Sequence, residues 1–151
     1  VVEEPDNIAA RGGMQVGACL AGIAFLKGLG LVHAISHMVG AEYDTHHGLT
    51  NAVVLPAVLR FNEPAIAGKV PAMMRALGQP GTDFDEFYRY VCGLLDQFQI
   101  PRTLSELGVP ESAAETLTIK ALKDAAAGTN PRVSDADSLM TVITEALTVG
   151  R

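Results

Sequence analysis

The chain of 151 residues has a net charge of −6, and 48% of its residues are hydrophobic, with no Trp and only 5% aromatics. This length suffices for one domain with a core. Such a core must consist mainly of Ala, Leu, Val, Ile and Met, a composition that favours helices. The negative charge and the lack of a basic run exclude a nucleic-acid footprint, because phosphate binding needs clustered Lys and Arg. They also argue against attraction to anionic lipid.

The cysteines and the apolar runs indicate the compartment. Cys19 and Cys92 lie far apart in apolar stretches, outside any Cys-x-x-Cys motif, and are typical of buried thiols in a cytoplasmic protein. The longest apolar run, residues 14–26, is interrupted by Gln15. We expect it to be too short to span a bilayer, and it lacks the flanks of a signal peptide. The chain opens with Val1, which fits a processed start or the inner edge of a longer protein.

The first half of the chain predicts three helices. Pro5-Asp6-Asn7 indicates a helix start with Asp6 or Asn7 as N-cap, and the helix should run to about residue 27. It contains four glycines, each costing roughly 1 kcal/mol relative to Ala, so we expect it to be held by close packing against neighbours. Gly28-Leu29-Gly30 ends it, and an apolar pattern resumes over residues 31–40. After a polar connection, residues 47–61 predict a helix in which Pro56 causes a kink or break.

The second half predicts further helices over residues 69–77, 82–98 and 110–127, and a single turn over 103–107. Thr82 is the candidate N-cap of the amphipathic helix 82–98, and Gly128 ends the helix 110–127. Asn130-Pro131-Arg132 indicates a turn, after which Ser134 would cap a last helix to about residue 149. No segment alternates with the period of two that strands require. We therefore expect an all-α fold of seven or so helices in a compact bundle.

The four histidines, His33, His37, His46 and His47, fall within 15 positions. The first two are four residues apart and would share one face of a helix. That spacing suits two ligands of one metal ion, or one ligand beside a proton carrier, but interior histidines satisfied by hydrogen bonds are an alternative. Adjacent residues on a helix point about 100° apart, so at most one of His46 and His47 can join the cluster.

Other chemical motifs are absent or weak. There is no His-Glu-x-x-His, no Gly-x-Ser-x-Gly, and no glycine-rich phosphate loop. Glu42 and Asp44 lie in a polar connection and are expected to be solvated. Phe25 is expected to belong to the core, with a place in a substrate channel as the minority alternative.

Two neighbouring segments carry a specific resemblance. Residues 28–37 read Gly-Leu-Gly-Leu-Val-His-Ala-Ile-Ser-His, and residues 43–56 contain His47-Gly48 followed by Asn51-Ala52 and Leu55-Pro56. This resembles the iron-containing alcohol dehydrogenases, whose pattern is Gly-Leu-Gly-x-Val-His-Ala-x-x-His, a short loop, and then His-Gly-x-x-Asn-Ala-x-x-Leu-Pro. The resemblance extends upstream over residues 20–25 and downstream to Asn130-Pro131-Arg132, and so covers nearly the whole chain.

The resemblance implies the fold of the helical C-terminal domain shared by dehydroquinate synthase-like proteins and iron alcohol dehydrogenases. It implies an NAD- or NADP-dependent oxidoreductase that interconverts an alcohol and an aldehyde or ketone. Its divalent metal, Fe²⁺ or alternatively Zn²⁺, is bound by one Asp and three His. By motif match His33 and His47 are two of these ligands, whereas His37 is a catalytic histidine that faces the nicotinamide cofactor and the substrate.

The chain also departs from the family pattern. It has no Asp-x-x-x-His, which would supply the other two ligands, and no nucleotide-binding motif. We therefore expect residues 1–151 to be the C-terminal helical metal-binding domain of a longer protein, inactive without its N-terminal dinucleotide-binding domain, and prone to form a homo-oligomer. Two alternatives remain at this stage: a stand-alone helical metal-binding module, and a purely structural helical domain. Nicotinamide-dependent alcohol oxidation by the full-length gene product would distinguish the first interpretation from both.

Overall fold

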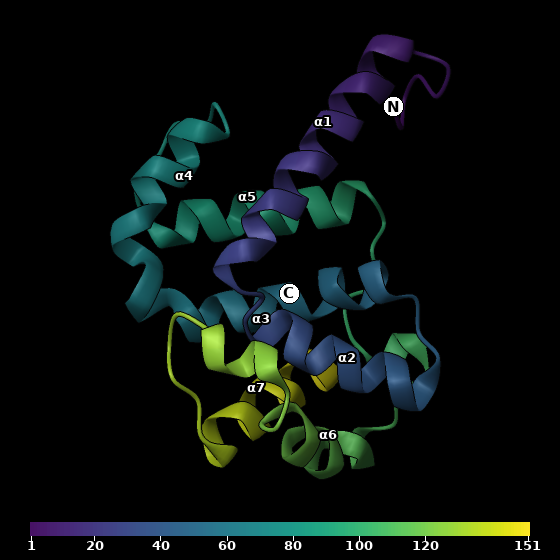
Figure 1. Ribbon diagram of the computed structural model, residues 1–151, viewed down its shortest axis with the longest axis vertical. Coiled ribbons are helices and arrows are strands. Elements are labelled where there is room, and N and C mark those ends of the chain that lie inside the picture. The colour runs from purple at the N-terminus through teal and green to yellow at the C-terminus, as the bar shows by residue number, and fades with distance from the viewer.

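Helices account for all regular structure of this protein. The computed structural model describes residues 1–151 and contains seven α-helices and five short 3-10 helices, with no strand (Figure 1). The all-α expectation is confirmed.

Four helices enclose the main core. They are α2 (Leu31–Tyr43), α3 (His47–Ile66), α6 (Ala114–Ala121) and α7 (Ala136–Thr148), which lie together in the lower part of Figure 1. Along α2 the buried apolar residues recur at helical spacing, so one face packs inward. The opposite face remains available for polar side chains. The buried residues of α2 in this core are Leu31, Ala34, Ile35 and Val39.

A smaller core joins the end of α3 to α4 (Val70–Ala76) and α5 (Phe84–Gln97). It contains Ile66, Val70, Met74, Phe84 and Phe87. This part lies above the main bundle in Figure 1, and so away from α2 and α6.

Two predicted N-caps are wrong by one residue. Asp83, not Thr82, caps α5 in a reciprocal capping box with Glu86, and Asp135, not Ser134, caps α7 in the same way with Ser138. In each case the aspartate side chain accepts from the backbone N–H of the residue three positions later, and the side chain of that residue accepts from the aspartate N–H. Two backbone N–H groups are therefore satisfied together.

Helix continuity also differs from expectation at two places. Helix α3 continues through Pro56 and Pro64 without a break, because its buried face is held by the main core. The predicted helix 110–127 is instead a 3-10 turn, η4 (Glu111–Ala113), then α6, and a second 3-10 segment, η5 (Ala125–Thr129). The interruption falls at Asp124, whose side chain accepts a hydrogen bond from the backbone N–H of Ala126 and so competes with helical bonding.

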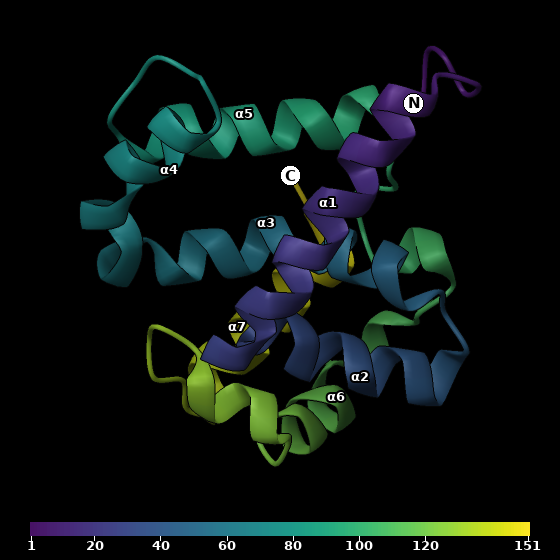
Figure 2. The ribbon, with the colours of Figure 1, turned by 45° about the horizontal axis from the view of Figure 1, so that its top comes forward.

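The N-terminal helix stands apart from the other helices. Asn7 caps α1 (Ile8–Ala24), as expected, and η1 (Phe25–Lys27) extends it, but α1 buries no residue. Figure 2 shows it projecting across the outside of the bundle. Nothing lies within 4 Å of a Cβ placed on any of its four glycines. The expectation of close packing is therefore wrong within this chain, because no neighbour covers the helix.

The N-terminal helical segment is longer than the apolar run 14–26 that was judged too short to span a bilayer. Residues Ile8–Lys27 form one helical segment of 20 residues that is long and apolar enough to cross a membrane by length and composition, and none of it is buried. The helix continues through polar positions at both ends of the apolar run, which accounts for the difference.

A loop-to-loop contact fixes the start of α2. The N-cap of α2 is Gly30, which has no side chain to cap the helix. The cap comes from the other end of the chain: Asn130 Oδ1 accepts from the N–H of Leu31 at 3.1 Å, and Thr129 Oγ1 accepts from the N–H groups of Leu29 and Gly30 at 3.1 and 3.4 Å. The first N–H groups of a helix need such acceptors.

This contact requires glycine at position 28. Gly28 has a φ of +102°, and a Cβ placed there would lie 2.4 Å from Thr129 Cβ. We predict that Gly28→Ala lowers the free energy of unfolding by about 2–4 kcal/mol, because it adds backbone strain and a clash. Gly12→Ala in the exposed α1 is the matched control and should not lower it, because Ala meets open space there and favours a helix by up to about 1 kcal/mol over Gly. Urea unfolding followed by circular dichroism measures both, and equal stabilities of the two variants would contradict this account.

Candidate metal centre

Three of the four histidines meet where α2 and α3 lie side by side. His33 and His37 are on one face of α2, and His47 is the first residue of α3. The ring centroids of His33 and His47 are 5.3 Å apart, those of His37 and His47 are 5.6 Å apart, and those of His33 and His37 are 5.8 Å apart. The spacing of four residues on α2 produces one side of this triangle, and the turn between the helices produces the other two.

The turn that brings His47 into place is tight. Asp44, at the C-cap of α2, has a left-handed backbone with φ of 51°, a conformation that Asp tolerates better than most residues. His46 then becomes the N-cap of α3 and accepts a hydrogen bond from the Leu49 N–H through its Nδ1. Its ring is thereby used for capping, and, as expected, only one of the adjacent histidines joins the cluster.

His33 and His47 direct the same ring atom to a shared neighbour. His33 Nε2 lies 3.3 Å and His47 Nε2 lies 3.2 Å from the side-chain nitrogen of Asn51. Asn51 follows His47 by one helical turn, so both project from the same face of α3. The Nε2 atoms of two imidazoles from two helices are therefore brought to one region.

The surroundings of His33 keep its ring neutral. Burial, and then the nearby His47 and His37, lower the pKa of His33 below its usual value. A neutral imidazole retains a lone pair, which is the form that ligates metal. Phe25 packs edge-on against this ring at 5.4 Å between centroids. Phe25 itself is 55% exposed, so the expectation that it belongs to the core is wrong.

His37 is held by a residue that the sequence analysis did not single out. His37 Nδ1 lies 3.0 Å from Asp124 Oδ2. Although burial opposes ionisation, hydrogen bonds from the Ala126 N–H and from His37 hold the pKa of Asp124 below its usual value. Asp124 was predicted to be in the interior of a helix. An aspartate followed by three alanines and Gly128 is a recognisable start signal for a new helical segment, and could have indicated the break.

The remaining carboxylates near the cluster have other roles. Both Glu42 and Asp44 are exposed, as expected, but Glu42 lies in the last turn of α2 and not in the connection, and it pairs with Lys120. No set of three His, Cys, Asp or Glu side chains in the chain converges as a metal site. The donor set fits two imidazole ligands of a divalent metal, one fewer than the three protein ligands that a metal site usually has.

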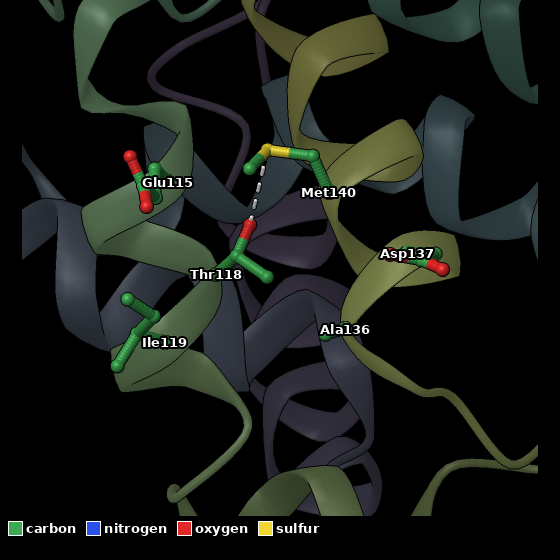
Figure 3. Close-up of a pocket in the computed structure, with 6 residues that line it drawn as sticks. All are labelled: Glu115, Thr118, Ile119, Ala136, Asp137 and Met140. Atoms are coloured by element: carbon green, nitrogen blue, oxygen red, sulfur yellow. Dashed lines mark hydrogen bonds between the residues drawn. The ribbon is translucent and has the colours of Figure 1, made fainter.

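The cluster also lacks an enclosing wall. None of the five cavities in the structure is lined by a histidine. A cavity of about 310 Å³ lies between α6 and α7 (Figure 3), where Thr118 Oγ1 and Met140 Sδ are 3.6 Å apart and Glu115 and Asp137 also belong to the lining. Its lining residues are separate from the histidine cluster, in which His47 is exposed and the other two rings are half-buried.

The chain is similar to known proteins over most of its length. The chain is 34% identical to the NAD-dependent methanol dehydrogenase of Bacillus methanolicus over 97% of its length, and 31% identical to the NADPH-dependent butanol dehydrogenase of Clostridium saccharobutylicum over 86%. A crystal structure of 1,3-propanediol oxidoreductase matches 94% of the chain with a TM-score of 0.88 and 33% identity.

The chain is much shorter than these proteins. It spans 40% of the methanol dehydrogenase, 36% of the butanol dehydrogenase and 39% of the 1,3-propanediol oxidoreductase chain. The sequence profile described as "Fe-containing alcohol dehydrogenase family, C-terminal" matches residues 1–147. This chain therefore belongs to the iron-containing alcohol dehydrogenase family, in the region that the profile describes as C-terminal.

Proposed function

We propose that this chain is the metal-binding portion of an NAD- or NADP-dependent alcohol dehydrogenase that interconverts an alcohol and an aldehyde or ketone. In this proposal His33 and His47 ligate a divalent metal, Fe²⁺ or Zn²⁺. His37 faces the substrate and the nicotinamide. The observation that carries the proposal is the approach of His33 Nε2 and His47 Nε2 to the same Asn51 nitrogen, beside a third imidazole.

The chemistry assigns a different task to each ring. A divalent metal held there would act as a Lewis acid on the substrate oxygen while hydride passes to the nicotinamide. The His33 ring is neutral, so it does not have to release a proton before it binds the metal. Asp124 accepts from His37 Nδ1, which leaves His37 Nε2 as the acceptor. His37 can therefore take the hydroxyl proton of an alcohol that lies within hydrogen-bond distance.

The rest of the site would come from a longer polypeptide. A protein metal site usually needs at least three protein ligands, and only two imidazoles converge here. The relatives extend well beyond the matched region, since the chain covers only 34–40% of their lengths. We propose that the preceding part of such a protein supplies the remaining ligands, the nucleotide site and a wall over the histidines.

The exposed α1 fits the same proposal. The match to 1,3-propanediol oxidoreductase covers 94% of the chain, which is too much to leave out α1. We infer that α1 is covered by protein rather than lipid, in a cytoplasmic enzyme whose subunits form a homo-oligomer. Unpartnered apolar helices of this kind favour association.

The first prediction concerns the isolated chain. We expect the purified 151-residue protein to retain well below one equivalent of metal after dialysis, because two ligands leave the ion mostly hydrated. It should not bind NADH at micromolar concentration, because it has no glycine-rich strand-to-helix turn. Elemental analysis and a fluorescence titration with NADH measure these quantities. Stoichiometric metal or micromolar NADH binding would support a stand-alone module instead.

A second prediction separates the roles of the histidines in the full-length gene product. His37→Ala should lower alcohol turnover by about 10²–10⁴-fold, the usual contribution of a general base, with little change in metal content. His33→Ala should remove metal and activity together. His46→Ala is the matched control, because its ring caps α3 outside the cluster, and should retain most of both. Loss of metal from His37→Ala would identify that residue as a ligand.

A third prediction concerns acid and Asp124. Because its folded pKa lies below the unfolded value of about 3.9, the ionised carboxylate stabilises the fold above that pH, and this stabilisation is lost as pH falls through the folded pKa. Asp124→Asn retains an N-cap side chain but not the charge. The stability difference between wild type and Asp124→Asn in urea should therefore be larger at pH 7 than in acid. An equal difference at pH 7 and at a pH below the folded pKa of Asp124 would contradict the stabilising role of the ionised carboxylate.

A further inference from the structure

The side chain of Asn51 has no hydrogen-bond partner other than the two rings. Its nitrogen contacts His33 Nε2 and His47 Nε2, and its oxygen is buried without any partner. An amide that served to brace the fold would be expected to have backbone or side-chain partners at its oxygen, because buried polar atoms are usually satisfied. The orientation of Asn51 therefore serves the histidines.

The donors and acceptors match in number. A carboxamide nitrogen carries two N–H groups, and a neutral imidazole has one ring nitrogen that accepts. Asn51 can donate one N–H to each ring only if both Nε2 atoms are unprotonated, so both rings must carry their proton on Nδ1. For His33, a hydrogen bond between its ring and the Leu29 backbone raises the pKa of the ring, as expected of a ring N–H that donates to a carbonyl.

We propose that Asn51 is a positioning residue that, in the metal-free protein, donates to His33 Nε2 and His47 Nε2 and so fixes both rings in the Nδ1–H tautomer. The two Nε2 lone pairs are then already turned to one region, and neither Nε2 has to lose a proton before it ligates. The contacts of Asn51 with the two rings are present without metal. Their role in preparing the rings for a metal ion rests on the proposed function.

The two rings depend on Asn51 to different degrees, and this difference can be measured. His33 keeps its Leu29 contact when Asn51 is removed, whereas His47 is exposed and has no other partner in the chain. A free imidazole favours the Nε2–H tautomer. Loss of the Asn51 donor should therefore change the tautomer of His47 more than that of His33.

The decisive experiment is ¹⁵N NMR of the histidine rings in the metal-free 151-residue chain at about pH 8.5, well above the unperturbed histidine pKa. Wild-type His33 and His47 should both show the Nδ1–H pattern. In Asn51→Ala, His47 should change to mainly Nε2–H. His46 is an internal control: its Nδ1 accepts from the Leu49 N–H, so its Nε2–H tautomer should persist and report that α3 remains folded.

Zn²⁺ titrations test separately whether the Asn51 contacts favour metal binding. Asn51→Ala should bind Zn²⁺ about tenfold more weakly, as is usual when a group that orients ligands is removed. Asn51→Asp, which has the same shape, adds a carboxylate beside both Nε2 atoms and should bind at least tenfold more tightly than wild type.

The outcomes are distinguishable. An unchanged His47 tautomer in Asn51→Ala, or Zn²⁺ binding by that variant as tight as wild type, would overturn the positioning role. If the tautomer changes as expected but Asn51→Asp gains no affinity for Zn²⁺, the positioning of the rings stands. The proposed metal function then fails.

Discussion

The structure depends on one short segment, residues 124–130, lying against α2. At one end of this segment Asp124 accepts from His37, and at the other Thr129 and Asn130 accept from the first N–H groups of α2. The helix that carries two of the clustered histidines is thus held at its N-terminus and near its middle by the same stretch of chain. Because a helix is stiff between such points, its rotation against α3 is set, and with it the approach of His33 to His47.

The same segment is itself anchored from behind. The side-chain amides of Asn130 and Asn62 donate to each other at 2.7 and 3.1 Å, and Arg132 donates to the Phe61 carbonyl and lies over the Phe61 ring. Asn62 and Phe61 belong to α3, so α3 positions the segment that positions α2. This closed set of contacts gives a physical reason for the distant Gly-Leu-Gly and Asn-Pro-Arg motifs to occur together.

The polar groups around the cluster are arranged so that each ring presents the same atom. Asp124 engages Nδ1 of His37, the Leu29 carbonyl engages the His33 ring, and Asn51 faces Nε2 of His33 and His47. Groups of this kind decide tautomer and ring orientation in metal sites. In the proposed function these groups would hold the His33 and His47 rings in position before the remaining ligands join them.

The helical fold, most helix bounds and the histidines that come together could be predicted from the amino-acid sequence. These follow from local rules: apolar spacing along α2 and α5, glycines at helix ends, and the four-residue interval between His33 and His37. The motif resemblance indicated the family. Short-range signals of this kind act within one or two helical turns, which is why they can be read from the chain.

The partners of those residues could not be predicted, because they depend on how distant segments pack. Asp124 reaches His37 across 87 positions, and Asn130 caps α2 across 99; no local pattern encodes such separations. Asp83 and Asp135, and not the residues before them, are the N-caps because each forms reciprocal hydrogen bonds with the residue three positions later. The exposure of α1 depends on whether another surface covers it, because an apolar helix has the same sequence whether its neighbour is in the same chain, in another part of a longer protein, or absent.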